Sequence, residues 1–493
     1  MFKHVIGSRK QTATGTQART ASSKWGLISL SLSMLLSSLG TSSANVALPT
    51  LAQVFNATFQ EVQWIVLAYL LAITTLIVSV GRLGDITGRR LLLLTGLSIF
   101  TVASVICGTA PTLWLLIAAR MVQGLGAAIM MALTMALVGQ TVPKEKIGSA
   151  MGLLGTMSAV GTALGPSLGG VLIDGVGWRA IFFINGPLGV LALLTAHRHL
   201  SVDLREPKTQ RNDLDMKGSF VLTVTLGLYA LAMTIGRGSL GLLNGALLMA
   251  AAVGVGVFLR IEARAASPLI PLAMFRAPVL SVSLAMSALV STVIMVTLVV
   301  GPFYLARALQ LEAAQVGLVM TTGPLVAALV GVPSGRLVDR FGEQRMTVVG
   351  LLGMTSGSFA LSIMPATLGI VGYITPLVFI TAGYALFQTA NNTAVMNGVR
   401  PDQRGVISGL LNLSRNLGLI TGTSVMGAVF AFASATTDIR TAKAEAVACG
   451  MRTTFAVAAT LLIIALAIAV SGRFLIRFTR TTHRATEEGH DSK

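Results

Sequence analysis

Residues Gly81–Arg90 read GRLGDITGRR between two apolar stretches, and residues Gly335–Gly342 read GRLVDRFG between two others. The second copy begins 254 positions after the first (335 minus 81). A repeated basic, glycine-containing segment between hydrophobic stretches indicates that the chain contains two related halves. Two similar helical bundles with a site between them are a common plan of secondary transporters, so transport is the first hypothesis.

The composition predicts an all-helical membrane protein. Hydrophobic residues make up 54% of the 493 residues and charged residues only 11%, a balance that soluble domains do not show. Apolar stretches of about 17 to 25 residues recur, each long enough to cross a hydrocarbon core of ~30 Å as a helix. We count fourteen, within residues 25–48, 62–80, 91–109, 112–140, 147–172, 179–196, 218–236, 241–259, 279–303, 316–334, 346–364, 369–396, 405–433 and 453–472.

The charge pattern indicates topology rather than nucleic-acid binding. The net charge is +18, but a nucleic-acid-binding protein gathers its basic residues on one face or tail. Here most lysines and arginines lie in alternate loops, which predicts a multi-pass protein of the cell membrane with both termini in the cytoplasm.

Nothing in the sequence indicates catalysis. The two cysteines, Cys107 and Cys449, offer neither a disulfide framework nor metal-ligand spacing. There is no phosphate-binding loop for ATP and no HExxH motif. We therefore expect no enzyme activity, no metal and no cofactor, and an ion gradient as the energy source.

The spacing of the copies predicts a 6+2+6 arrangement. Six spans precede the linker, but the copies lie further apart than six spans require, so two extra spans were inserted between the halves. The expected organisation is a cytoplasmic tail (1–24), a six-helix bundle (25–197), a cytoplasmic linker (198–217), two inserted helices (218–260), a second six-helix bundle (261–474) and a cytoplasmic tail (475–493).

The repeated segment is a candidate cytoplasmic gate. Its glycines permit a tight turn and close helix approach, and its aspartate can pair with arginine or cap a helix. A charged cluster that forms when the cytoplasmic side closes would bias a two-state equilibrium, whereas the alternative is a basic loop that only sets topology. The candidate gate residues are Gly81, Asp85, Gly88, Arg89, Arg90, Gly335, Asp339 and Arg340.

The fifth span has a face almost without side chains. It carries Gly161, Gly165, Pro166, Gly169 and Gly170, with three of the glycines repeating at every fourth position. Small residues at that spacing let a neighbouring backbone come close, and the proline removes a helix hydrogen bond and bends the span. A tight, bendable seam is expected; ordinary helix packing without a transport role is the alternative.

These motifs together resemble those of the major facilitator superfamily. The repeated segment resembles its loop signature, Gly161–Gly170 resembles its antiporter motif, and its fourth-helix RxxQGxG motif is matched by Arg120, Gln123, Gly124 and Gly126. Four further segments are similar to the fourteen-helix drug/proton antiporter branch, namely Asn45–Pro49, Trp178–Asn185, Pro268–Phe275 and Ser408–Gly418. The resemblance implies a major-facilitator-type fold and efflux of lipophilic compounds driven by proton entry. It also implies a cytoplasmic gate at the loop motif and a seal between the halves at the fifth span.

One position departs from the branch. The first span usually reads LDxTIVNVALP there, whereas this chain has Gly40 at the acidic position. None of the 18 acidic residues lies at the centre of a span. Proton coupling is therefore implied by the resemblance alone, with Arg120, Asp85 and Asp174 as coupling candidates; both aspartates have a structural role as the alternative.

Two arginines lie inside spans, Arg120 in the fourth and Arg415 in the thirteenth. An arginine within a span costs ~2.5 to 3.5 kcal/mol on insertion scales, so it normally faces the interior. Without a buried acid, the pair would make a weakly electropositive route, which suits neutral or anionic amphipaths better than dications. The alternative is that both extend to the interface or bond backbone carbonyls.

Polar and adaptable side chains inside the spans are candidates for a substrate cavity. The alternatives are hydrogen bonds between helices for the polar residues and space filling for methionine. The candidates are Ser37, Thr41, Asn45, Gln123, Met131, Tyr304, Gln388, Asn391, Asn412 and Arg415.

The sequence thus predicts a secondary active transporter that exports small amphipathic toxic compounds or drugs from the cytoplasm by alternating access. Its expected partners are the substrate, protons as counter-ion and the lipid bilayer, with a monomer as the working expectation. The alternatives are a proton-independent or anion-linked metabolite exporter and a membrane sensor that does not transport.

Overall fold

The computed structural model describes residues 3–142, 147–200, 216–234, 241–265, 278–396, 404–434 and 442–488. These residues form helices joined by short connections, with no β-strand among them. Thirteen helices are long and apolar enough to cross a membrane, and Lys217–Ala232 is a shorter apolar helix at the place of the seventh predicted span. The all-helical membrane fold is confirmed, and the complete set of fourteen crossings stays a prediction.

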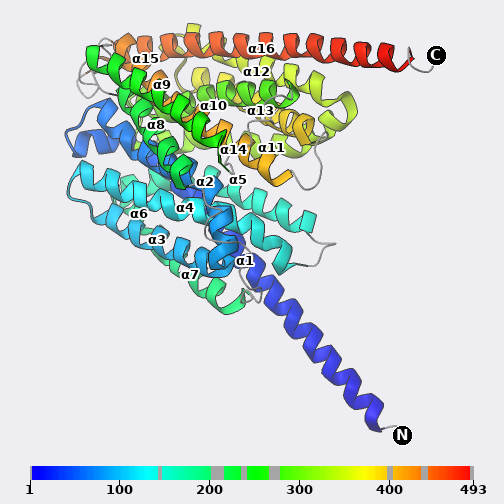
Figure 1. Ribbon diagram of the computed structural model, residues 1–493. Coiled ribbons are helices and arrows are strands. Elements are labelled where there is room, and N and C mark those ends of the chain that lie inside the picture. Colours follow the sequence, from blue (N-terminus) through cyan, green and yellow to red (C-terminus); the bar gives the residue numbers. More distant parts are fainter. Residues whose placement is uncertain are drawn as a thin grey trace.

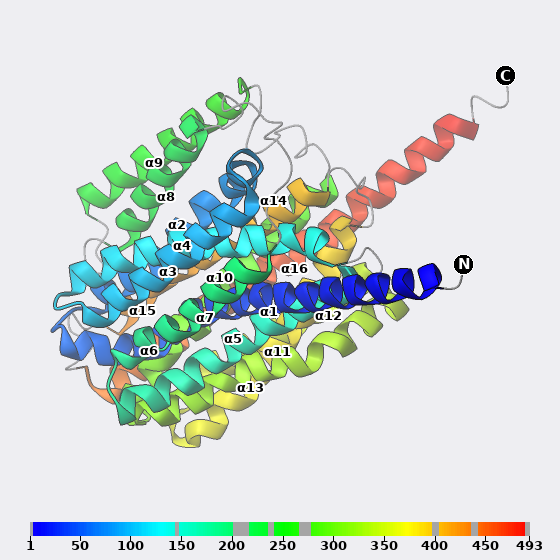
Figure 2. The same cartoon turned by 90° about the horizontal axis from the view of Figure 1, so that it is seen from below.

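Two bundles lie one above the other in Figure 1. The first bundle contains α1 (Lys3–Val54), α2 (Phe59–Thr87), α3 (Arg89–Thr109), α4 (Leu113–Thr141), α5 (Ile147–Gly175), α6 (Ala180–Phe183) and α7 (Asn185–His199). The second contains α10 (Pro278–Phe303), η4 (Tyr304–Ala308), α11 (Ala313–Phe341), α12 (Glu343–Ile363), η5 (Ala366–Leu368), α13 (Gly369–Met396), α14 (Arg404–Thr421), η6 (Gly422–Met426), α15 (Gly427–Ala433) and α16 (Ala444–Glu488). Between them in sequence, α8 (Met216–Thr234) and α9 (Leu242–Glu262) form a pair at the edge of the molecule (Figure 2).

The two halves repeat in helix length and in turn geometry. Helices α2 and α11 both contain 29 residues, and α11 begins 254 positions later (313 minus 59). Helices α3 and α12 both contain 21 residues at the same offset. In each half, a single glycine with positive φ joins the two helices: Gly88, at 93°, lies between α2 and α3, and Gly342, at 85°, lies between α11 and α12. Side chains disfavour this conformation. The GRLGDITGRR segment is therefore not a loop: residues 81–87 complete α2, and the turn is Gly88 alone.

Helices α2 and α11 also begin with similar N-terminal capping. Thr58 caps α2, accepting from the backbone amide of Glu61, while the Glu61 carboxylate accepts from the amide of Thr58 at 2.7 Å. At the equivalent start of α11, the side chain of Gln315 accepts from the amide of Glu312 at 3.1 Å. Reciprocal capping satisfies amides that the first turn leaves unpaired, which fixes where each helix begins.

The long helices α1 and α16 extend beyond the bundles at the same end in both views (Figures 1 and 2). We refer to that end, which also carries Gly88 and Gly342, as the inner end, following the predicted cytoplasmic topology. The opposite end, which carries the connections 55–58, 176–179 and 309–312, is the outer end.

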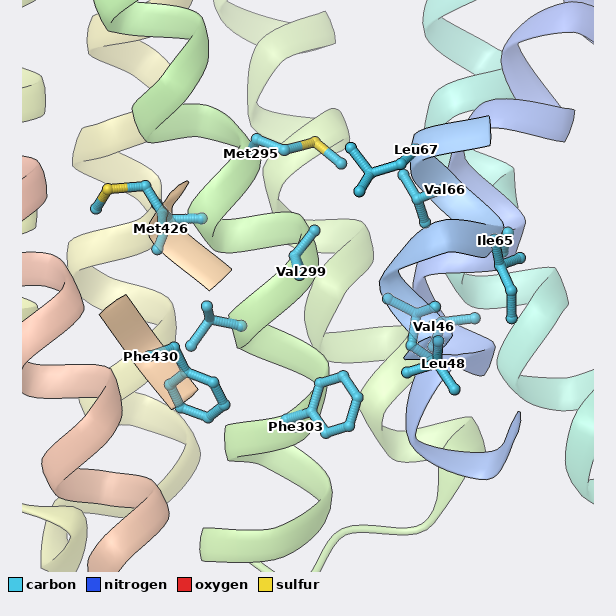
Figure 3. Packing of buried hydrophobic residues seen from close by; sticks show 14 of the residues in the cluster. Val46, Leu48, Ile65, Val66, Leu67, Met295, Val299, Phe303, Met426 and Phe430 are labelled. Atoms are coloured by element: carbon cyan, nitrogen blue, oxygen red, sulfur yellow. The ribbon is translucent and has the colours of Figure 1, made fainter. Parts of the chain in front are cut away.

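Among the described side chains, the apolar core is shared at the outer end and divided at the inner end. Side chains of α1 and α2 such as Leu48 and Leu67 join Val299, Phe303 and Phe430 of the second bundle in one cluster (Figure 3). Towards the inner end, separate clusters occupy the first bundle and the second bundle. The described halves are thus packed against each other mainly through their outer parts.

Candidate functional site

Arg120 is the most strongly buried charged side chain among the described residues, with 1% of its surface exposed. Its Nε donates to the carbonyl of Ile65 at 3.1 Å, and its Nη1 donates to the carbonyl of Gly40 at 3.0 Å and to Oε1 of Gln123 at 2.6 Å. Its guanidinium carbon lies 4.1 Å from the centre of the Tyr69 ring. The second terminal nitrogen has no hydrogen-bond partner among the described residues.

The Arg120 network joins four helices of the first bundle. Gln123 donates onward to the hydroxyl of Ser104 on α3 at 2.7 Å, and Tyr69 on α2 donates to the carbonyl of Ser37 on α1 at 2.9 Å. Every described partner of Arg120 is neutral, so its charge is stabilised by carbonyl dipoles and a ring face rather than by a carboxylate. The sequence indicated Arg120 and Gln123, whereas Tyr69 and Ser104 carried no signal.

The space beside Gly40 is already filled. A β-carbon at this position would lie 3.1 and 3.2 Å from ring carbons of Phe100 and 3.2 Å from the Tyr69 hydroxyl. An acidic side chain could therefore enter only if the Phe100 ring moved. The departure from the branch pattern is accompanied by an aromatic ring in the place that a carboxylate would take.

The polar side chains along α1 donate hydrogen bonds to carbonyls of their own helix. Ser37 donates to the carbonyl of Ser33 at 2.7 Å, Thr41 to that of Ser37 at 2.9 Å, and Asn45 to that of Thr41 at 3.4 Å. Only the side-chain oxygen of Asn45 is buried without a described partner. Of these candidates, Asn45 alone keeps an unused acceptor.

The cavity candidates of the second half are not brought into one described cluster. Asn391 donates to the carbonyl of Ser283 at 3.3 Å, and the side-chain oxygens of Gln388 and Asn391 have no described partner. Arg415 is half-buried, and its Nε also has none. No described contact links Arg415 to Arg120, so the two arginines do not form one described site.

Three further candidates lie elsewhere. Tyr304 is buried at the outer end, where its ring stacks on Tyr373 with centres 5.9 Å apart. Met131 packs against the core of the first bundle. Asn412 is half-buried on α14.

The glycine-rich motif of α5 packs against two different helices, one on each of two faces. Gly161, Gly165 and Gly169 face α1, where β-carbons would meet the Leu35 carbonyl, Ser42 and Val46 respectively. Ser42 also donates to the carbonyl of Gly161 at 3.2 Å. This face is a seam inside the first bundle, where bare backbone allows α1 to approach closely.

The other face of α5 contacts the second bundle. A β-carbon at Gly170 would overlap the carbonyl oxygen of Ala313, and one at Gly317 would overlap the carbonyl oxygen of Pro166. At the end of α5, a carboxylate oxygen of Asp174 accepts from the amide of Ala314 at 2.6 Å, in the first turn of α11. The carboxylate of one bundle thus caps a helix of the other, a favourable position for a negative charge.

A second small-residue seam, which the sequence analysis missed, occupies the equivalent place in the second bundle. β-carbons at Gly418 and Gly422 would meet the carbonyls of Ala288 and Thr292 on α10, and Ser414 donates to the carbonyl of Leu284 at 2.6 Å. The repeat at every fourth position was present in the sequence, but its first member is serine and no proline follows.

The gate candidates lie at the inner end, partly outside the described side chains. Gly81 and Asp85 belong to α2, but their surroundings lie outside the described part of the structure. Arg89 donates to the carbonyl of Ala136 at 3.4 Å and Arg90 to that of His197, both within the first bundle.

In the copy, Asp339 and Arg340 are exposed, and the Arg340 guanidinium lies 5.3 Å from the centre of the Phe341 ring. Gly335 has open space around it. Neither Asp339 nor Arg340 makes an ionic contact with a described residue, so the charged cluster of the gate hypothesis stays a prediction. The described residues also contain no group of three or more histidines, cysteines or acids that could hold a metal.

Comparisons with known proteins agree with this architecture. The family model described as Major Facilitator Superfamily matches residues 30–423. The chain is 32% identical over 383 residues to "Uncharacterized transporter YebQ" of Escherichia coli (strain K12), covering 78% of this chain and 84% of that protein. It is 31% identical over 414 residues to "Multidrug resistance protein Stp" of Mycobacterium tuberculosis, covering 82% and 75%.

Among solved structures, a bacterial homolog of the human lysosomal transporter Spinster, inward-facing and unoccupied, has the same fold, with a TM-score of 0.68 at 17% identity. The match covers 92% of this chain and 98% of that one. The family match spans most of the chain, and the fold agrees with it. The chain therefore belongs to the Major Facilitator Superfamily and is a membrane transporter.

Proposed function

We propose that this transporter exports small amphipathic toxic compounds or drugs from the cytoplasm by alternating access. The observation that carries the proposal is the uneven core formed by the described side chains: one apolar cluster joins the bundles at the outer end, while separate clusters fill them at the inner end. When two bundles touch at one end only, rocking of one against the other can change the side of the membrane to which a central site is open. The relative Stp is named as a multidrug resistance protein, which supports drugs as the substrate class.

A panel of toxic compounds tests this function. A susceptible host that expresses the chain is expected to tolerate several members of the panel better than the same host without it. Adding a protonophore should remove the gain if export is proton-driven. Unchanged tolerance, with folded protein in the membrane, would instead favour the membrane sensor that does not transport.

Exchange for protons belongs to the proposal, with Asp85, Asp174 and Arg120 as coupling candidates. Asp174 is supported by its position: its carboxylate bonds the first turn of α11 across the outer end, where external protons arrive. A negative charge is favoured at the first turn of a helix, so this bond should stabilise the closed outer end.

Asp174→Asn fixes that side chain in an uncharged state. We expect the variant to open its outer end more often, because the neutral amide lacks the negative charge that favours the bond to the first turn of α11. Export measured in vesicles over a range of external pH tests its part in coupling, with Glu312→Gln, at the same helix start, as the control. A variant with an unchanged pH profile would remove Asp174 from the coupling candidates.

A second candidate function, proton-independent export of neutral or anionic amphipaths, is favoured by one observation. Arg120 is buried with neutral partners only, and one of its terminal nitrogens is unpaired among the described residues. A buried cation without a carboxylate partner repels lipophilic cations and attracts anions.

Tetraphenylborate and tetraphenylphosphonium decide between the candidates, because they share one shape and carry opposite charge. Equilibrium binding to the protein in lipid nanodiscs, with protein-free nanodiscs subtracted, should favour the anion roughly tenfold if the second candidate is right. Tighter binding of the cation would exclude it.

The remaining parts of the proposal follow from the predicted topology. The chain is placed in the cell membrane as a monomer with both termini in the cytoplasm, α8 and α9 at the periphery, and the residue 81–90 segment with its copy as the cytoplasmic gate.

A further inference from the structure

Gln63 crosses from the first bundle to the second. It is fully buried near the outer end of α2, and its Nε2 donates to the carbonyl of Thr423 at 2.9 Å. The helix turn that follows is bare at Gly427, where a β-carbon would overlap the Gln63 amide. The side chain thus fits a gap that the second bundle leaves for it.

The duplication shows that the fold does not need a side chain at this place. Gln63 is equivalent to Gly317 (317 minus 63 is 254), and Gly317 lies against Pro166 and Gly170 with no side chain of its own. The two outer seams between the bundles are therefore related by the repeat but built differently. One is backbone against backbone, whereas the other contains a hydrogen-bonding side chain.

The acceptor lies in an irregular part of its helix. Residues Gly422–Met426 form a single π-turn, η6, a feature that is rare in helices and common at functional sites. The side-chain oxygen of Gln63 is buried without a described partner, so its amide is only half satisfied in this state. Water entering an opened seam could satisfy both ends of the amide and the Thr423 carbonyl, which lowers the barrier to breaking the bond.

Aromatic packing surrounds the bond without replacing it. Phe59, one turn before Gln63 on α2, has its ring centre 4.7 Å from that of Phe303 and 5.1 Å from that of Phe430. These contacts are apolar and tolerate small shifts, whereas the hydrogen bond has one geometry. The Gln63 amide gives this seam a directional contact.

We propose that Gln63 is the gating residue of the α2–η6 seam: its bond to Thr423 holds the outer end closed, and its rupture is a step in outward opening. This inference rests on the alternating access of the proposed function. It adds a residue for which the sequence motifs gave no sign, and it assigns the two outer seams different roles. The glycine seam brings the bundles together, and the Gln63 seam sets how long they stay closed.

Distances between spin labels test this assignment, in a background with Cys107→Ala and Cys449→Ser. Labels at the exposed residues Val176 and Leu368 report the outer end, and labels at the exposed residues Leu91 and Phe341 report the inner end. The variant Gln63→Met keeps the length of the side chain but cannot donate. Gly427→Ala displaces the amide from the other side of the seam.

Gln60→Met is the matched control. Gln60 is a buried glutamine of the same helix that makes no hydrogen bond to a described residue.

Both seam variants are expected to raise the outward-open population about two- to tenfold, the range that one net hydrogen bond gives. The outer distance should lengthen while the inner distance shortens, and the control should match the parent protein. A merely structural role would loosen both ends together or lower stability without a shift, and either result would overturn the assignment. If Gln63→Met fails to fold, Gln63→Asn, which is polar but too short to reach Thr423, takes its place.

The labels report conformation without any substrate. A failed export assay with shifted distances would therefore remove the proposed export and leave the gate, whereas unshifted distances in a working exporter would remove the gate alone.

Discussion

Gly170→Ala is expected to abolish export while the protein remains folded in the membrane. The added methyl group would overlap the backbone carbonyl of Ala313 in the other bundle, and a carbonyl within a helix start cannot rotate away as a side chain can. Overpacking of this kind costs ~1 to 3 kcal/mol, and here the cost falls on the state in which the outer end is closed. The transporter should therefore be held away from that state, and efflux of a fluorescent substrate should fall at least tenfold.

Two further variants make the Gly170 result specific. Gly175→Ala, five residues later on α5, adds the same methyl group into open space and should export normally. Gly317→Ala meets the Pro166 carbonyl from the opposite side of the seam and should reproduce the defect. Normal efflux by Gly170→Ala would show that the α5–α11 seam does not need to close during transport.

Arg120→Lys is expected to reduce both export and thermal stability although the charge is kept. The guanidinium bonds the carbonyls of Gly40 and Ile65 on two different helices, and it lies over the ring of Tyr69. A lysine ammonium is a point charge that cannot reproduce this planar, forked arrangement. Each buried carbonyl left unpaired costs ~1 to 3 kcal/mol, so the four-helix network should loosen.

Export and the thermal unfolding midpoint of the purified protein measure the Arg120→Lys effect. We expect at least a tenfold loss of export and a clear drop in the midpoint. Arg179→Lys is the control, because this exposed arginine also lies over an aromatic ring, Trp178, at 4.5 Å, and it immediately precedes the apolar helix Ala180–His199. If lysine at position 120 supports normal export and stability, only the charge matters there and not the bridge.

Much of the architecture could be predicted from the sequence because it depends on local properties. A run of apolar residues long enough to cross lipid must become a helix there, since every backbone polar group needs an internal partner. The offset between GRLGDITGRR and its copy gave the repeat, which returns as equal helix lengths and as the two positive-φ glycines, Gly88 and Gly342. One detail was wrong: the motif was interpreted as a loop, but α2 continues to Thr87, because no residue before Gly88 interrupts it.

The candidate site was only partly predictable. Arg120 could be predicted as a site residue because a charged side chain inside a span is costly in lipid. The α5 seam could be predicted because glycines recur at every fourth position. Tyr69 and Ser104 were missed because a buried tyrosine or serine looks like any other core residue in one sequence. Ser37 and Thr41 stay candidates for cavity lining; their hydroxyls bond carbonyls of their own helix, which the spacing alone did not indicate.

By itself the sequence determined that this chain is helical, lies in lipid and is built as a repeat, because hydropathy, backbone satisfaction and glycine conformation act within short segments. Only the tertiary structure decided what stands beside Gly40, which face of α5 meets which bundle, and that Gln63 bonds Thr423, 360 positions away. Those contacts depend on how the helices are placed relative to one another. Such placement is a property of the whole packed molecule, in which each side chain fits the space that distant segments leave.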